Sequence, residues 1–67
     1  MKITLNNTEE TFDKNELTIS DLLKLSNFSY KLLIVKVNGK LVRKEAYDNT
    51  IVKDGDDVMV LHLVTGG

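Results

Sequence analysis

The 67-residue sequence contains no cysteine and no proline. Without cysteine, the chain cannot form a disulfide, a cysteine zinc site, a catalytic thiolate or a persulfide of its own. Aromatic residues make up only 6% of the chain, and nine basic against ten acidic residues give a formal net charge of −1. Nucleic-acid binding usually requires a basic surface with stacking rings, so we expect no nucleic-acid partner.

Long apolar runs are also missing. The first seven residues lack the apolar segment of a secretory signal, and no stretch approaches the roughly 18 apolar residues that a membrane span requires. We therefore expect a cytoplasmic protein that does not associate with a membrane. The hydrophobic share of 42% and the charged share of 28% are typical of a folded domain, and the length allows one small domain.

The first half of the sequence predicts a hairpin followed by a helix. Ile3 and Leu5 alternate with polar residues as in a half-buried strand, and after a turn over 7–10 we expect residues 11–17 to return as the second strand. A threonine with an acid three positions later resembles a helix capping box. Apolar residues at helical spacing then predict a short helix over 19–27.

The second half predicts another hairpin and a final strand. Residues 32–37 are dense in branched side chains, and the Asn38-Gly39 pair favours a two-residue turn with residues 40–43 returning. We expect residues 43–48 to form a turn or single helical turn with Tyr47 packed in the core. A last strand is expected over residues 58–64.

This order of elements predicts an α+β fold of the β-grasp type. In that arrangement the first and last strands lie side by side within a mixed sheet, and one main helix crosses one face. The predicted core consists of Ile3, Leu5, Ile19, Leu22, Leu23, Val35, Val37, Val58 and Val60.

Alternate residues of the last strand point to opposite faces of the sheet. One row carries a histidine: Val58, Val60 and His62. The other row is wholly apolar: Met59, Leu61 and Leu63. The pattern alone favours burial of the second row, whereas the β-grasp arrangement places the helix over the first. We adopt the second interpretation and predict that Met59, Leu61 and Leu63 form an exposed partner-binding row.

The sequence ends in Thr65-Gly66-Gly67. An extended pair of glycines has no Cβ atoms, so it can pass through a narrow channel and bring the Gly67 carboxylate to a reactive phosphate. That carboxylate is ionised at neutral pH. We therefore expect residues 1–64 to form the domain and residues 65–67 a flexible tail. The residues alone favour a frayed terminus without a function, and the alternative is that the tail is a substrate.

Other candidate sites are weak. His62 is the only histidine, and without a second histidine or a cysteine we expect no metal site and interpret His62 as a partly buried strand histidine. The β-grasp arrangement places its ring near the end of the sheet, within reach of water. Asp54, Asp56 and Asp57 lack the spacing and the distal glutamate of an EF-hand, so we interpret them as a solvated turn. Gly39 and Gly55 each stand alone, so the chain shows no phosphate-binding loop of its own.

The whole chain resembles the ThiS family, the small ubiquitin-like sulfur carriers of thiamin biosynthesis. Three patterns carry the resemblance: Val-Asn-Gly-Lys-Leu-Val at 37–42 running into 43–47, Val-Lys-Asp-Gly-Asp at 52–56, and the final Gly66-Gly67. Family members often carry proline where this chain has Arg43, a departure that affects a turn. The small subunit of molybdopterin synthase looks similar but tends to be longer.

The resemblance implies a carrier rather than an enzyme, with no catalytic residue and no bound cofactor. A ubiquitin-activating-type enzyme would use ATP and Mg²⁺ to adenylate the Gly67 carboxylate. A cysteine persulfide on another protein would convert the product to a thiocarboxylate, and the thiazole synthase would receive the sulfur.

Three alternatives stay open at this point. The chain could carry sulfur for another pathway, such as molybdopterin, cysteine or tRNA thiolation. It could be a protein modifier whose Gly67 forms isopeptide bonds with lysines. It could also be a β-grasp interaction domain with an inert tail.

Overall fold

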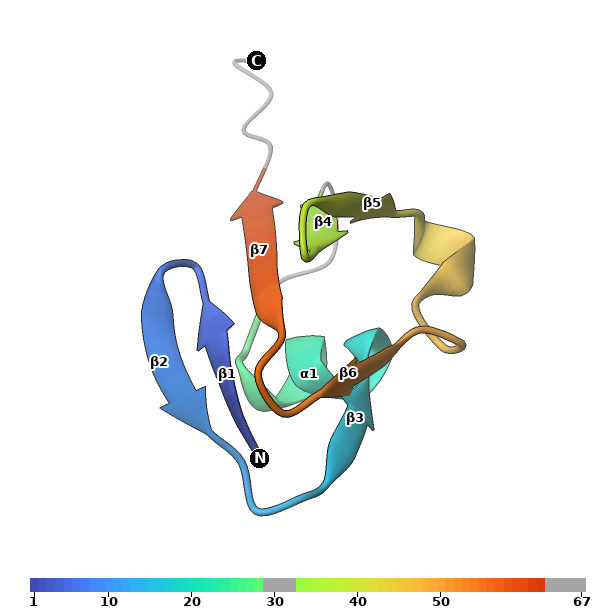
Figure 1. Ribbon diagram of the computed structural model, residues 1–67. Coiled ribbons are helices and arrows are strands. Elements are labelled where there is room, and N and C mark those ends of the chain that lie inside the picture. The colour runs from blue at the N-terminus through green and yellow to red at the C-terminus, as the bar shows by residue number, and fades with distance from the viewer. Residues whose placement is uncertain (29–32, 63–67) are drawn as a thin grey trace.

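The computed structural model describes residues 1–28 and 33–62 (Figure 1). Its elements follow the chain in this order: β1 (Lys2–Leu5), β2 (Thr8–Thr11), β3 (Glu16–Thr18), α1 (Ile19–Leu25), β4 (Leu33–Val37), β5 (Lys40–Val42), the 3₁₀ helix η1 (Lys44–Ala46), β6 (Ile51–Lys53) and β7 (Asp57–His62). Within these residues, no helix is long and apolar enough to cross a membrane.

Five strands form one mixed sheet in the order β2-β1-β7-β4-β5. The first and last strands, β1 and β7, run parallel at its centre, and the other neighbouring pairs are antiparallel. Figure 1 shows β7 running between β1 and β4, with α1 on one side of the sheet. The predicted α+β, β-grasp-type arrangement is therefore confirmed.

The core lies between α1 and the sheet. All the predicted core residues are buried except Val37, which is half-buried against the core at the end of β4, next to the turn. Two further buried residues, Leu17 and Val52, were not predicted.

These two residues belong to a second, two-stranded sheet formed by β3 and β6, in which Leu17 lies opposite Val52. The prediction that residues 11–17 pair with the first strand is therefore wrong. The partner of β1 is β2, reached through a tight turn at Asn6 and Asn7, both with positive φ. Asparagine tolerates this left-handed conformation better than most residues, so the chain reverses earlier than the apolar pattern indicates.

The helix begins as predicted and ends two residues early. Thr18 is the N-cap, and its hydroxyl accepts a hydrogen bond from the backbone N–H of Asp21 at 3.1 Å. At the other end, Asn27 has a φ of 58°. The N–H of Asn27 bonds to the Lys24 carbonyl and that of Phe28 to the Leu23 carbonyl, which is the Schellman pattern. Asparagine here takes the place of the usual glycine.

The second hairpin is formed as predicted. Asn38 and Gly39 have φ values of 51° and 83°, and Val37 lies opposite Lys40 across the turn. Tyr47 follows η1 and packs against the core, partly buried. Partial burial, together with the nearby Glu45 carboxylate, raises the pKa of the Tyr47 phenol.

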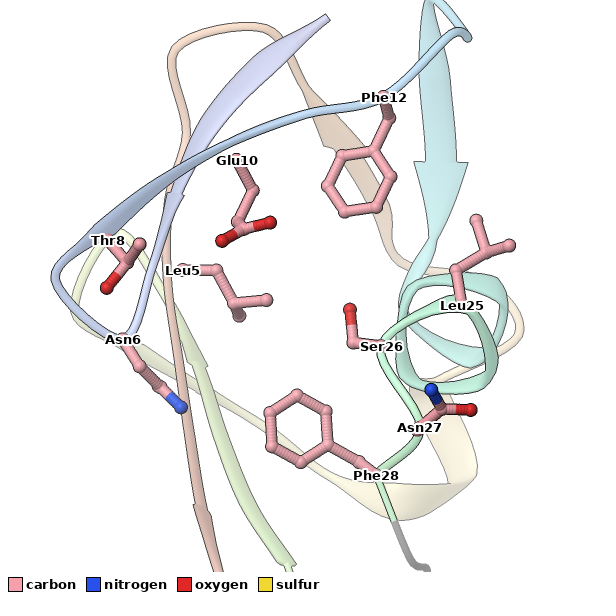
Figure 2. A pocket seen from close by; sticks show the side chains of 9 residues that line it. All are labelled: Leu5, Asn6, Thr8, Glu10, Phe12, Leu25, Ser26, Asn27 and Phe28. Carbon is pink, nitrogen blue, oxygen red and sulfur yellow. The ribbon is translucent and has the colours of Figure 1, made fainter.

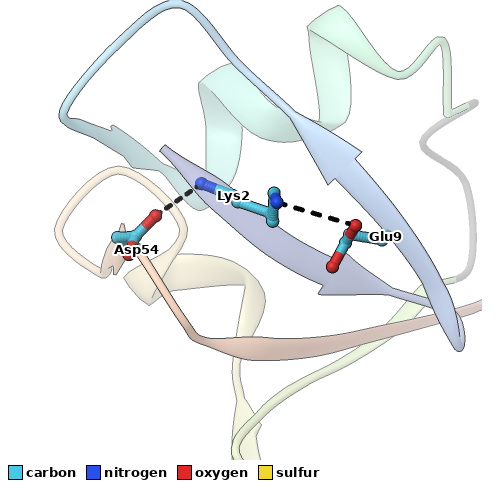
Figure 3. A network of polar contacts seen from close by, with 3 residues as sticks. All are labelled: Lys2, Glu9 and Asp54. Carbon is cyan, nitrogen blue, oxygen red and sulfur yellow. Dashed lines mark hydrogen bonds and ion pairs between the residues drawn. The ribbon is translucent and has the colours of Figure 1, made fainter.

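The aspartate-rich turn before β7 makes hydrogen bonds to residues at the ends of several strands. Asp54 accepts a hydrogen bond from the backbone N–H of Lys2 at 2.6 Å, and the Lys2 ammonium lies 3.8 Å from Glu9 (Figure 3). Asp56 accepts from the backbone N–H of Lys53 and from the side-chain amide of Asn38. These carboxylates accept backbone hydrogen bonds, in agreement with the interpretation of Asp54 and Asp56 as turn residues, whereas Asp57 is the first residue of β7.

Candidate functional site

The sheet face opposite α1 carries a group of apolar side chains that the helix leaves uncovered. On β7, Val58 and Val60 are buried toward α1, so Met59 and Leu61 point to the other face. The pairing register places Leu61 opposite Ile34 and Met59 opposite Lys36. The interpretation that sets Val58 and Val60 beneath the helix is therefore correct.

Strand β5 extends this face by one residue. Leu41 lies opposite Lys36, on the same face as Met59. We call the set Ile34, Leu41, Met59 and Leu61 the outer patch. Leu41 is 59% and Leu61 46% exposed, and Ile34 and Met59 are half-buried. The exposed Lys36 lies between its members, so the outer patch combines apolar area with one cation.

The structure brings together only part of the predicted partner-binding row. Met59 and Leu61 lie in the outer patch, whereas Leu63 and the tail residues Thr65, Gly66 and Gly67 lie outside the described residues. Sequence reasoning missed Ile34 and Leu41. Their signal was present, because each alternates with a core-facing valine in a strand that was otherwise predicted.

Among residues 1–28 and 33–62, no group of three or more histidine, aspartate or glutamate side chains is arranged to hold a metal ion. His62 is exposed at the end of β7. The expectation of a partly buried strand histidine is therefore wrong, whereas the exposure agrees with the β-grasp arrangement, which places the ring near the end of the sheet, within reach of water.

One open pocket of about 400 Å³ lies between the β1–β2 hairpin and the end of α1. Figure 2 shows two phenylalanine rings and two leucines around it, with Glu10 on the hairpin side. Glu10 is the single titratable side chain in the lining, and general acid–base work normally requires a tuned partner or base within hydrogen-bond reach. The pocket therefore shows no catalytic arrangement.

Comparison with known proteins gives one consistent family. The model of the ThiS family matches residues 2–67. The chain is 33% identical over 63 residues to the sulfur carrier protein ThiS of Bacillus subtilis (strain 168), a match covering 94% of this chain and 96% of the relative.

Two solved structures from Geobacter metallireducens are similar to this chain and point to the same family. The crystal structure of its thiamine biosynthesis protein ThiS matches with a TM-score of 0.89 and 35% identity, covering 100% of both chains. The solution structure of a thiamine biosynthesis protein from that organism matches with a TM-score of 0.82 and 35% identity, over 100% of this chain and 88% of that one. On the family model, the curated relative and the fold together, this chain belongs to the ThiS family.

Proposed function

We propose that this protein is a sulfur carrier for thiamine biosynthesis and that it acts through the carboxylate of Gly67. The observation that carries the proposal is the match of the ThiS family model up to residue 67, which includes the Gly66-Gly67 pair. The full-length correspondence with the crystal structure of a ThiS protein supports it further. On this proposal the chain is a substrate of its partners rather than an enzyme.

The chemistry begins with activation of an unreactive group. A carboxylate is a weak electrophile, and joining Gly67 to the α-phosphate of ATP, with release of pyrophosphate, gives a mixed anhydride with a reactive acyl carbon. A ubiquitin-activating-type partner would supply the ATP and Mg²⁺ sites, since the sequence shows no phosphate-binding loop. This ATP-dependent step would take place in the cytoplasm.

Sulfur then replaces the activated oxygen. The terminal sulfur of a cysteine persulfide on a donor protein attacks the acyl carbon and displaces AMP. A thiol cleaves the resulting acyl disulfide, is itself oxidised to a disulfide with the donor, and leaves a thiocarboxylate on Gly67. The thiazole synthase would take the sulfur from this group. The carrier has no cysteine, and this route requires none.

The tail residues Thr65, Gly66 and Gly67 would deliver the carboxylate. An extended chain advances about 3.3 Å per residue, so three residues reach roughly 10 Å. The two glycines present no side chain to a channel that closes around the backbone. The domain can then stay outside a recessed nucleotide site while its terminus enters.

The outer patch, together with Leu63 beyond the described residues, is the surface we propose for docking on the activating enzyme and later on the synthase. Interface centres are typically rich in apolar and aromatic side chains, and Leu41 and Leu61 expose such area beside Lys36. A complementary partner surface would present an apolar area with a carboxylate facing Lys36.

Intact-mass measurement tests the proposed function. Incubation with the cognate activating enzyme, ATP, Mg²⁺ and a persulfide donor should raise the mass by the difference between sulfur and oxygen, and iodoacetamide should alkylate the product. The variant lacking Gly67 is the control and should not change. Transfer to the thiazole synthase should return the original mass.

Other results would support the alternatives. Heavy adducts on other proteins, joined through Gly67, would indicate a protein modifier. A thiocarboxylate that the thiazole synthase does not discharge would indicate a carrier for another pathway. An unchanged mass under all conditions would contradict the proposal and favour an inert tail.

A further inference from the structure

The side chain of Asn6 continues the central parallel strand pair beyond the point where β1 ends. The last paired residues of β1 and β7 are Leu5 and Val58, and the backbone N–H of Asn6 donates to the Val58 carbonyl at 2.9 Å. The Asn6 carboxamide then bonds twice to Val60. Its Oδ1 accepts from the Val60 N–H at 2.7 Å, and its Nδ2 donates to the Val60 carbonyl at 3.1 Å.

A carboxamide carries the same donor and acceptor as a peptide group. The Asn6 side chain therefore gives Val60 the two hydrogen bonds that a continued parallel strand would supply from two residues, a carbonyl at position 6 and an N–H at position 8. The backbone cannot do so, because the chain turns away at Asn6, whose φ is 51°. Figure 2 shows the Asn6 side chain directed at the neighbouring strand β7.

The position of this contact gives it a functional meaning. Val60 lies seven residues before Gly67, and Leu61, which follows it, belongs to the outer patch. We propose that Asn6 is a positioning residue. Its hydrogen bonds to Val60 fix the position of the end of β7, so that the tail extends from a defined point toward a partner docked on the outer patch. This inference rests on the proposed function of the tail.

Only asparagine fits both requirements at this position. The turn needs a residue that accepts a positive φ, and the strand needs a donor and an acceptor on one short side chain. Glycine satisfies the first requirement alone, and aspartate lacks the donor. Asn7 shares the turn with a φ of 67° and is exposed, and within the described residues its side chain makes no hydrogen bond. It therefore supplies a matched control.

The test compares Asn6→Gly, Asn6→Asp and Asn7→Gly with the wild type. Amide hydrogen exchange followed by NMR reports on β7 directly. Exchange at Val60, relative to that at Val35 in β4, should be about tenfold faster in Asn6→Gly, the size expected for lost backbone partners, and unchanged in Asn7→Gly. Asn6→Asp should fall between, because it keeps the acceptor.

Kinetics with the cognate activating enzyme separate positioning from docking. In ATP–pyrophosphate exchange, Asn6→Gly should lower kcat about tenfold, while the Kd for the enzyme stays within about twofold, because the outer patch is intact. Asn7→Gly should match the wild type in both. Asn6→Asp keeps the fold of the turn and should give an intermediate kcat.

Two results would overturn the inference. Unchanged protection at Val60 in Asn6→Gly would show that the carboxamide does not hold β7. Faster exchange at Val60 with a wild-type kcat would show that the held strand does not position the tail. The proposed function fails if neither the wild type nor Asn7→Gly supports ATP–pyrophosphate exchange. The positioning role then fails with it, whatever the hydrogen-exchange protection at Val60.

Discussion

At the scale of single residues, α1 offers two leucines in opposite environments. Leu23 is fully buried and Leu25 is 55% exposed. Truncating a buried leucine removes its transfer free energy and leaves a cavity, so Leu23→Ala should lower the free energy of unfolding by about 2–5 kcal/mol. Leu25→Ala is the matched control and should cost less than about 1 kcal/mol. Urea unfolding measures both, and a cost below about 1 kcal/mol for Leu23→Ala would contradict its place in the core.

The outer patch allows a second comparison at this scale. Leu61→Asp puts a charge at the centre of the proposed interface, so it should weaken binding to the activating enzyme by at least about 1.4 kcal/mol, a tenfold rise in Kd. Its melting temperature should change little, because Leu61 is already 46% exposed. Leu25→Asp makes the same change on the helix side and should leave binding unaltered. Failure of Leu61→Asp to fold would instead place that row in the core.

Residue burial could be predicted wherever a regular apolar pattern ran over enough residues to define one face of a helix or strand. The helix residues and the alternating valines of β4 and β7 met that condition. Leu17 and Val52 did not, because each lies in a strand of three residues, which is too short to show a period. The two are buried because β3 and β6 pair, a contact between segments distant in the sequence.

At the scale of elements, the start of α1 depends on one hydroxyl. Thr18→Ala removes the acceptor for the Asp21 N–H and should lower the free energy of unfolding by about 1 kcal/mol. Thr18→Ser keeps the hydroxyl and should recover most of that loss. Thermal unfolding of the two variants provides the measurement. Equal destabilisation by alanine and serine would mean that Thr18 matters for its methyl group in β3 rather than for capping.

The boundaries of the strands depend more on turn residues that adopt a positive φ than on the hydrophobic pattern. The Asn38-Gly39 turn was predictable because few other pairs adopt two positive φ values. The Asn6-Asn7 turn is its counterpart, but β2 after it reads Thr-Glu-Glu-Thr and is exposed throughout, so no apolar alternation indicated a strand. Its charged residues suit an edge strand, which has to avoid pairing with other molecules.

At the scale of the whole molecule, the last strand lies at the centre of the sheet rather than at an edge. β7 is held by β1 on one side and β4 on the other, and the Asn6 side chain extends the first contact to Val60. A strand paired on both sides can therefore present Met59 and Leu61 of the outer patch and, on the proposed function, lead toward Gly67. The sequence predicted this topology from the order of elements, but the tail's chemistry followed from family resemblance, since two glycines alone specify no reaction.

The proposed passage of the tail through a narrow channel can also be tested. Gly66→Val introduces a branched side chain where a channel would close around the backbone, so the rate of adenylation should fall while the fold is unchanged. Thr65→Val is the matched control, because valine has nearly the same shape as threonine, and it should retain most of the activity. Equal rates for Gly66→Val and the wild type would show that position 66 does not pass through a narrow channel.

The central claim is that the Gly67 carboxylate is the reacting group. ATP–pyrophosphate exchange with the cognate activating enzyme tests it most directly, comparing the wild type with the variant that lacks Gly67. The wild type should support exchange, and the deletion should abolish it, because the shortened chain ends one residue from the phosphate. Exchange at the wild-type rate by the deletion variant would contradict the claim and leave the tail without a role in activation.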